Sequence, residues 1–281
     1  MGSAVPASDA RLRLFQGTRP LKRWRYVGIF CEEFAACAAL VQIGPAHQSF
    51  WALCPRDGST PRERTRLLPR RGEVELEPGD IAAGSDEGRP GRMRVRDKNV
   101  ELDLVLEEGS AIEAVCPHGR GKVWTRKQAG IAAHGTLAID GVAPRAVEAR
   151  AVIDDTAGYH ARVTEWRWSA GVGEDAGGIP VAWNLVSGVN DPPSASERAV
   201  WVAGSPTEAP PVSFSENLSL IRCDDGSEMR FAAESERSRR DNFIVLMSDY
   251  RAPFGTFSGT LPGGIQLARG LGVVERHRAR W

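Results

Sequence analysis

Long apolar runs are missing from this 281-residue chain, and so is any excess of charge of one sign. No run reaches the roughly 18–20 residues that a membrane-spanning helix needs, and the N-terminus, MGSAVPASDARLRLF, lacks the apolar core of a signal peptide. The 36 basic residues balance the 36 acidic ones, which gives no indication of a nucleic-acid partner. These absences favour a cytoplasmic protein with no integral membrane segment and no nucleic-acid ligand.

Motifs for metals, cofactors and nucleophilic catalysis are missing as well. The sequence has no CxxC pair and no HExxH, so we expect no structural zinc and no zincin-type site. It also lacks GxGxxG, GxxxxGK[ST] and GxSxG, the signatures of phosphate-binding loops and of the α/β-hydrolase nucleophile. The cysteines are Cys31, Cys37, Cys54, Cys116 and Cys223. Their odd number and irregular spacing argue against a disulfide framework, and we expect neither a metal nor a cofactor.

Helical periodicity over ten or more residues is nearly absent, whereas short apolar or alternating segments recur throughout the chain. Turn-forming pairs such as Asp57-Gly58 and Asp140-Gly141 separate these segments. The segments that we expect to form strands are 24–31, 34–44, 47–54, 100–108, 135–142, 179–188, 198–204, 228–236, 242–251 and 270–281. Many short strands at this spacing predict an all-β fold, built as an antiparallel barrel or sandwich.

Two breaks in composition interrupt the strands. Residues 69–93 are rich in glycine, proline and charge, which predicts an exposed loop or an edge hairpin. Residues 116–130, CPHGRGKVWTRKQAG, interrupt the apolar pattern near the middle of the chain, and we place a domain or half-barrel boundary there. The sequence therefore predicts an N-terminal extension (1–23), an N-terminal β-domain (24–125) and a C-terminal β-domain (126–281).

The segment 154–173, DDTAGYHARVTEWRWSAGVG, carries more large, polar-tipped side chains than a strand that only fills a core. If it is one strand, alternation divides its side chains between two faces. One face carries His160, Arg162, Trp166 and Trp168, and the other carries Tyr159, Glu165 and Arg167. His160 could then act as a general acid or base, and the tryptophans could pack on a flat or cationic ligand. The alternative is that His160 is a hydrogen-bonded core residue and the tryptophans only pack.

The C-terminal strand, LGVVERHRARW, provides a second, independent candidate. Arg276, Arg278 and Arg280 share one face, which we expect to face solvent, so Glu275 and His277 lie on the apolar face. An inward Glu beside an inward His costs free energy unless the two pair with each other or with a ligand. We predict a catalytic acid/base pair here, and the alternative is a structural hydrogen-bonded pair.

Other segments supply candidate ligand-binding groups. In IPVAWNLVSGVND, Asn184 belongs to an expected central strand with two apolar faces, so its amide needs a partner from a ligand or from the fold. Tyr250 combines polar and aromatic character in SDYRAPFGTFSGTLPGG, whose glycines suit turns and close packing. In WTRKQAG, Arg126 and Lys127 beside Trp124 could dock an anionic group, although we favour an exposed connection.

Four of these segments together resemble the bacterial DUF2804 family, a domain of unknown function: YHARVTEWRWSAGVG, VAWNLVSGVND, SDYRAPFGTFSGTLPGG and GVVERHRARW. The N-terminal WRYVGIF and HQSFWAL fit the same pattern, so the resemblance extends from about Trp24 to Trp281. More distantly, the aromatic-rich strands resemble calycin-like proteins with two lipocalin-type β-barrel halves, such as carotenoid 1,2-hydratases, tocopherol cyclase and decalin-forming Diels–Alderases. That resemblance implies two packed halves and a cofactor-free reaction on an apolar substrate.

The leading hypothesis is a two-part β-barrel protein that binds a hydrophobic small molecule or lipid, with a cofactor-independent hydration, isomerisation or cyclisation as the candidate reaction. The candidate proton-transfer residues are His160, Glu275 and His277. The candidate binding residues are Tyr159, Arg162, Trp166, Trp168, Asn184 and Tyr250. The alternatives are a non-catalytic lipid or pigment carrier with the same pocket, and an interaction protein that uses the charged 69–93 segment. Nothing in the sequence indicates the oligomeric state.

Overall fold

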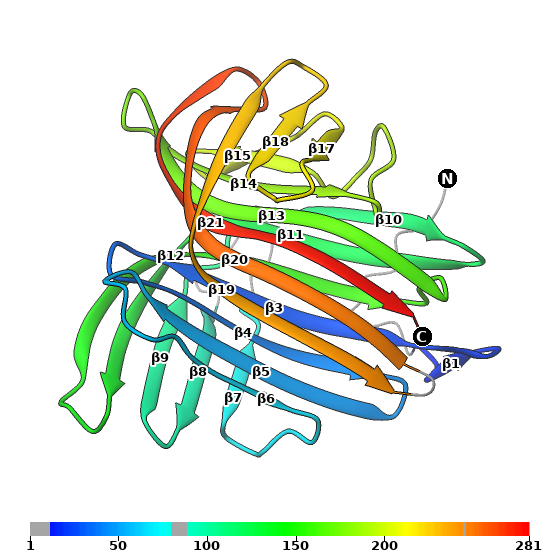
Figure 1. Cartoon of the computed structure of the whole chain (residues 1–281), viewed down its shortest axis with the longest axis horizontal. Coiled ribbons are helices and arrows are strands. Elements are labelled where there is room, and N and C mark those ends of the chain that lie inside the picture. Colours follow the sequence, from blue (N-terminus) through cyan, green and yellow to red (C-terminus); the bar gives the residue numbers. More distant parts are fainter. Residues whose placement is uncertain (1–11, 80–88, 244–245, 281) are drawn as a thin grey trace.

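The computed structural model describes residues 12–79, 89–243 and 246–280. These residues form two large antiparallel sheets and one small hairpin (Figure 1). They contain no helix, and thus none that could span a bilayer. The two sheets follow one another along the chain, because the first ends at Gly158 and the second begins at Val163.

The first sheet contains ten strands. In sheet order they are β6 (Arg62–Arg66), β5 (Ala46–Pro55), β4 (Phe34–Ile43), β3 (Lys22–Phe30), β12 (Arg145–Gly158), β11 (Gly121–Ile139), β9 (Val100–Leu106), β8 (Gly91–Asp97) and β7 (Val74–Glu77), with β10 (Ile112–His118) also paired to β11. The hairpin of β1 (Phe15–Gln16) and β2 (Arg19–Pro20) precedes this sheet. With 19 residues, β11 is long enough to pair with β10 at one end and with β9 at the other.

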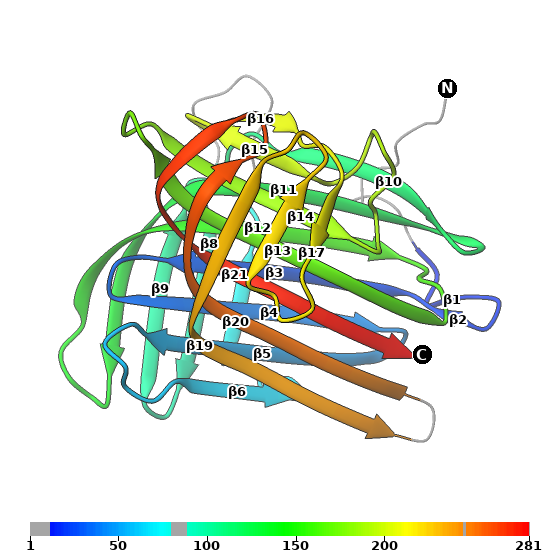
Figure 2. The same cartoon turned by 45° about the horizontal axis from the view of Figure 1, so that its top comes forward.

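The second sheet contains nine strands. In sheet order they are β16 (Ser205–Glu208), β15 (Ala199–Val202), β14 (Pro180–Ser187), β13 (Val163–Asp175), β21 (Ile265–Arg280), β20 (Leu246–Leu261), β19 (Glu228–Phe243), β18 (Leu220–Cys223) and β17 (Val212–Phe214). Both sheets curl into half-barrels, and the long strands of the second lie against β3, β4 and β5 of the first (Figure 2).

Side-chain alternation along the strands produces three apolar layers. On β3, Val27 and Ile29 point into the curl of the first sheet, whereas Tyr26 points toward the second sheet. On β14, Trp183 belongs to the interior of the second sheet and Ala182 to the layer between the sheets. Strands buried on both faces are largely apolar in sequence, as the second half of β3 and most of β14 are.

Small side chains occupy much of the layer between the sheets. Strand β4 contributes Ala35, Cys37 and Ala39, and the second sheet contributes Ala170 and Ala182. Small side chains let two sheets approach closely, since little volume separates the backbones. Toward one end of this layer the side chains become larger and polar, and the sheets enclose a cavity there.

The predicted all-β architecture of two lipocalin-like halves is confirmed. The expected faces of the C-terminal strand are also confirmed, because Arg276, Arg278 and Arg280 on β21 are exposed. Strand β14 is central, between β13 and β15, and Trp183 and Asn184 are both buried. Residues 69–93 contain the edge strand β7, which agrees with an edge hairpin, although 80–88 lie outside the described residues.

The prediction that 154–173 forms one strand is wrong. Strand β12 ends at Gly158, residues 159–162 connect the two sheets, and β13 begins at Val163. At Gly158 a Cβ atom would lie 2.3 Å from the carbonyl oxygen of Lys122, so the chain passes close to β11 before it leaves the sheet. His160 and Arg162 therefore do not share a strand face with Trp166.

Two other boundaries differ from the sequence-based expectation. Residues 242–251 are not one strand, because they contain the end of β19 and the start of β20, with 244–245 outside the described residues. Residues 124–130 are no exposed connection, because they lie within β11, while residues 116–118 end β10. The division between the two sheets thus falls at 159–162, whereas residue 126 lies inside β11.

Candidate functional site

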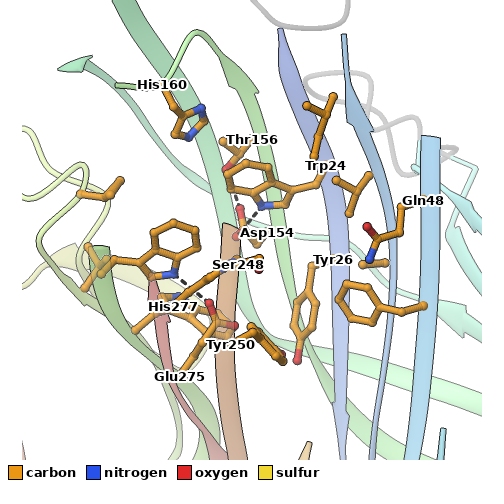
Figure 3. Close-up of a pocket in the computed structure, with 18 of the residues that line it drawn as sticks. Trp24, Tyr26, Gln48, Asp154, Thr156, His160, Ser248, Tyr250, Glu275 and His277 are labelled. Carbon is orange, nitrogen blue, oxygen red and sulfur yellow. Dashed lines mark hydrogen bonds between the residues drawn. The ribbon is translucent and has the colours of Figure 1, made fainter. Parts of the chain in front are cut away.

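A cavity of about 190 Å³ lies between the two sheets (Figure 3). Strands β3, β4, β5, β11 and β12 of the first sheet form one wall, and β13, β14, β19, β20 and β21 of the second sheet form the other. The segment between β14 and β15 contributes Val189, Asn190 and Glu197. Because both sheets supply the walls, the cavity depends on the packing of the two halves.

Aromatic side chains line both walls of the cavity. They are Trp24, Tyr26 and Phe50 from the first sheet and Trp166, Trp168 and Tyr250 from the second. The rings of Tyr26 and Trp168 meet edge to face, with centroids 5.6 Å apart. Burial raises the pKa of Tyr26 and of Tyr250 well above the usual value, so both phenols are neutral hydrogen-bonding groups. This lining suits an apolar ligand with flat or positively polarised parts.

Glu275, on β21, places a carboxyl on the second-sheet wall of the cavity. Its Oε1 accepts a hydrogen bond of 2.8 Å from Nε1 of Trp166, which lies on β13 two residues before Trp168, the residue paired with Glu275. Burial, only partly offset by this hydrogen bond, raises the pKa of Glu275 to about 7. A carboxyl with that pKa can both release and accept a proton near neutral pH.

His277 lies two residues beyond Glu275 on the same face of β21. Its Nε2 is 2.8 Å from the Oγ of Ser248, and its ring centroid is 4.3 Å from that of Trp166. Burial, with the charge of Lys22, lowers the pKa of His277 to about 3. The imidazole is therefore neutral and acts as a hydrogen-bonding group rather than as a cation.

A buried charge network forms the opposite side of the cavity. Lys127 on β11 places Nζ 2.5 Å from Oδ1 of Asp154 and 3.5 Å from Oε1 of Glu197. Burial alone would lower the pKa of Lys127, but the two carboxylates together raise it, so the ammonium is retained. Asp154 also accepts hydrogen bonds from Nε1 of Trp24 (3.0 Å) and from the Thr156 hydroxyl (2.8 Å).

Arg237 closes the cavity between the edge of the first sheet and the second sheet. Its guanidinium carbon lies 4.1 Å from the ring centroid of Phe50 and 5.1 Å from that of Tyr250. On β6 it pairs with Glu63 (Nε to Oε2, 3.1 Å) and donates to the Thr65 hydroxyl (2.8 Å). These contacts hold the aromatic walls in position, because the cation lies between the two rings.

His160 lies in the connection between the sheets and faces the cavity from the end away from Glu275 (Figure 3). Its ring packs against Trp24, with centroids 5.3 Å apart, and edge to face against His118 at 5.1 Å. Neither ring nitrogen makes a hydrogen bond of normal geometry within the described part of the chain. Burial, with Lys22 and His118, lowers the pKa of His160 well below its usual value, so the ring is neutral.

Six of the nine residues singled out from the sequence line this cavity: His160, Trp166, Trp168, Tyr250, Glu275 and His277. The other three do not. The hydroxyl of Tyr159 donates to the carbonyl of Arg13, and Arg162 is exposed in a separate pocket. Asn184 is buried behind the wall, where it accepts from Nε1 of Trp168 and donates to the carbonyl of Glu197, both at 2.8 Å.

The first-sheet side of the cavity was not predicted from the sequence. Trp24 and Tyr26 belong to an expected strand, yet nothing local indicates that they face a second sheet. Lys127 was assigned to an exposed connection, and its partners Asp154 and Glu197 come from other elements. Among the described residues, no group of three or more His, Cys, Asp and Glu side chains is placed to hold a metal ion.

Solved structures of similar fold cover nearly the whole chain. A protein from Nitrosomonas europaea assigned as an AttH is 13% identical, with 98% of each chain covered and a TM-score of 0.61. Kievitone hydratase from Nectria haematococca is 12% identical, with 91% of this chain and 88% of that chain covered and a TM-score of 0.57. CghA is 10% identical, with 92% and 88% covered and a TM-score of 0.50. At these identities the likeness shows the fold.

A sequence match assigns the family. No protein of curated function matches the sequence. The profile of the family described as a domain of unknown function (DUF2804) matches residues 84–281, which include all of the second sheet and the first-sheet strands β8 to β12. The match covers well over half of the chain and every one of the six cavity residues predicted from the sequence. The chain therefore belongs to the DUF2804 family.

Proposed function

We propose that this protein binds a hydrophobic small molecule in the cavity between its sheets and transfers a proton to or from it with Glu275, in a cofactor-independent hydration, isomerisation or cyclisation. The observation that carries the proposal is the position of Glu275. Its carboxyl lies on the same wall as Trp166, Trp168 and Tyr250, and Trp166 donates a hydrogen bond to one of its oxygens. A pocket built only to carry an apolar ligand gains nothing from a buried, ionisable carboxyl, because burial of that group costs free energy.

The cavity contains the groups that a proton transfer to a double bond requires. Protonated Glu275 can donate its proton to one carbon of the double bond, which leaves positive charge on the other carbon. The faces of Trp166 and Trp168 can stabilise that charge. In a hydration, a water oxygen then bonds to the second carbon and the water proton returns to the Glu275 carboxylate, so the enzyme is restored. In an isomerisation or cyclisation, the cation loses a proton from carbon, or bonds to a second double bond first.

His277 and Ser248 are a second pair of polar side chains on this wall. Because His277 is neutral and already hydrogen-bonded to Ser248, the pair can orient a water molecule or a ligand hydroxyl beside Glu275. His160, at the far end, can present a ring nitrogen to a polar group on the ligand, since neither nitrogen makes a hydrogen bond of normal geometry with the described residues. The fold neighbour named kievitone hydratase makes hydration the first reaction to test.

The test compares the ligand that co-purifies with the wild type and with Glu275→Gln. Each protein is incubated in D2O, returned to H2O and analysed by native mass spectrometry. Proton transfer to carbon leaves deuterium that survives the return to H2O, so we expect it in the wild-type ligand and not in the Glu275→Gln ligand. Hydration would also separate the two ligands by the mass of one water. Glu165→Gln, an exposed carboxyl on β13, is the matched control and should behave as the wild type.

A non-catalytic lipid or pigment carrier is the second candidate, because the same apolar cavity serves it. It predicts an identical ligand in the wild type and Glu275→Gln, with no carbon-bound deuterium in either. That result would contradict catalysis by Glu275 and leave the binding function standing.

A further inference from the structure

Three arginines that the cavity does not use gather at one end of the molecule. Arg19 lies at the start of β2, Arg120 lies in the β10–β11 turn, and Arg162 lies in the connection between the sheets. These three segments lie at the same end, to the right in Figures 1 and 2. Together with Gln16, Gly17 and Thr18, the arginines line a pocket of about 440 Å³ that shares no residue with the cavity between the sheets.

Backbone and ring contacts hold the three segments together. The amide of Tyr159 donates to the carbonyl of Lys122 (3.1 Å), and the amide of Ala161 donates to Nδ1 of His118 (3.1 Å). At Gly119, in the same turn, a Cβ atom would lie 3.5 Å from Nη1 of Arg19. The positive φ of Gly119 (63°) suits a glycine turn that admits the guanidinium. The arginines therefore converge because the fold brings their segments together.

Their charge is not balanced locally. The sequence contains no Asp or Glu in 10–31, 114–139 or 156–164, the stretches that supply the three arginines, although the chain as a whole is neutral. None of the three forms an ion pair with another described residue, whereas most arginines elsewhere in the described chain do. Nη1 of Arg19 is fully buried and lacks a hydrogen-bond acceptor among the described residues. A buried, unpaired guanidinium donor costs free energy unless a ligand supplies the acceptor.

The neighbouring His118 is affected by the same positive charge. Burial lowers the pKa of His118, and the charges of Lys22 and Arg19 lower it further. A bound anion would oppose these two cations and would raise the pKa of His118 toward its usual value.

We propose that Arg19, Arg120 and Arg162 form a binding site for a phosphoryl group of a small molecule, separate from the apolar cavity. Guanidinium groups bind phosphate oxygens through pairs of parallel hydrogen bonds. Three positive charges also suit a doubly charged phosphoryl group better than they suit a singly charged carboxylate. The Thr18 hydroxyl and the Gln16 amide, which line the same pocket, can donate to the remaining oxygens.

The test is a calorimetric titration of the full chain with inorganic phosphate at low ionic strength, followed by NMR titration of His118. We expect saturable binding that Arg162→Ala weakens tenfold or more, and a rise in the His118 pKa when phosphate is bound. Arg162 is exposed, so its removal should leave the thermal midpoint without phosphate unchanged. Arg71→Ala removes an exposed arginine from the turn before β7, and should bind phosphate as the wild type does.

Two results would overturn the proposal. Equal phosphate binding by the wild type and Arg162→Ala, or no change in the His118 pKa, would mean that phosphate does not bind among these arginines. Acetate binding as tight as phosphate would show that the pocket takes any small anion and would refute the phosphoryl assignment. Both results are independent of Glu275, since the pocket and the cavity share no residue.

Discussion

The interior of the first sheet and the layer between the two sheets are built from opposite faces of the same strands, yet their side chains differ in size and polarity. Inside the curl of the first sheet, Leu102, Leu104 and Leu106 of β9 are each at most 2% exposed and pack with aliphatic side chains from the facing strands. In the layer between the sheets, alanines and cysteines give way to tryptophan, tyrosine and carboxylate side chains at one end.

This difference shows where a two-part β-barrel protein can place a ligand. A single lipocalin barrel holds a ligand in its own interior, but here branched side chains fill that interior. The junction between the halves retains space because its facing residues differ in size along the strands. The junction is also where side chains from ten strands and two connecting segments converge.

The largest expected effect separates the two regions by stability. Leu104→Ala removes a fully buried side chain from the filled interior and should lower the free energy of unfolding by about 2–5 kcal/mol, because the space cannot collapse completely. Ile43→Ala, at the cavity wall, should cost about 1 kcal/mol or less, since that side chain is only half-buried and already borders space. Urea unfolding measures both, and equal losses would contradict the comparison.

The second effect depends on pH and belongs to the cavity alone. Glu275 has a pKa of about 7 when folded and an ordinary value of 4.5, so the folded protein holds this proton more tightly than the unfolded chain. The contribution of protonated Glu275 to the free energy of unfolding is fully present below about pH 4.5 and is lost as the pH rises through 7. At about 1.4 kcal/mol for each tenfold change in acidity, the loss reaches about 3 kcal/mol.

Glu275→Gln should not lose this stability, because glutamine does not titrate. Its free energy of unfolding, relative to that of the wild type, should therefore rise by about 3 kcal/mol between pH 4.5 and 8. Denaturant unfolding of both proteins across that range measures it. A difference that stays constant with pH would mean that Glu275 titrates normally and would remove the basis for its role in proton transfer.

The sequence predicted well what depends on local alternation. The inward faces of Trp183 and Glu275 and the outward face of Arg276 follow from a period of two within a single strand. The same rule failed at His160 and Arg162, because a polar four-residue connection without glycine or proline looks like more strand. His160 still reached the cavity, but from the connection rather than from the face of β13.

The charged residues of the cavity could not be predicted from short segments of sequence, for a different reason. Lys127 is buried because Asp154 on β12 and Glu197 before β15 compensate its charge, and only the packing of two sheets brings those carboxylates to it. Alone in its segment, a lysine between arginine and glutamine indicates solvent exposure. Ion pairs between residues far apart in the sequence depend on how the elements pack, and no short segment of sequence contains that information.

The smallest effect compares two serine hydroxyls with aromatic partners. Ser169 is fully buried in the filled interior of the second sheet, where it accepts from Nε1 of Trp183 at 3.0 Å. Ser169→Ala should leave that indole donor without an acceptor and cost about 1–3 kcal/mol. Ser248 lies at the cavity wall beside His277, so in Ser248→Ala water from the cavity can replace the hydroxyl, and we expect a loss of about 0.5 kcal/mol. Thermal and urea unfolding measure both losses. If Ser248→Ala costs as much as Ser169→Ala, water does not reach His277, and a hydration that draws its water from beside this histidine becomes untenable.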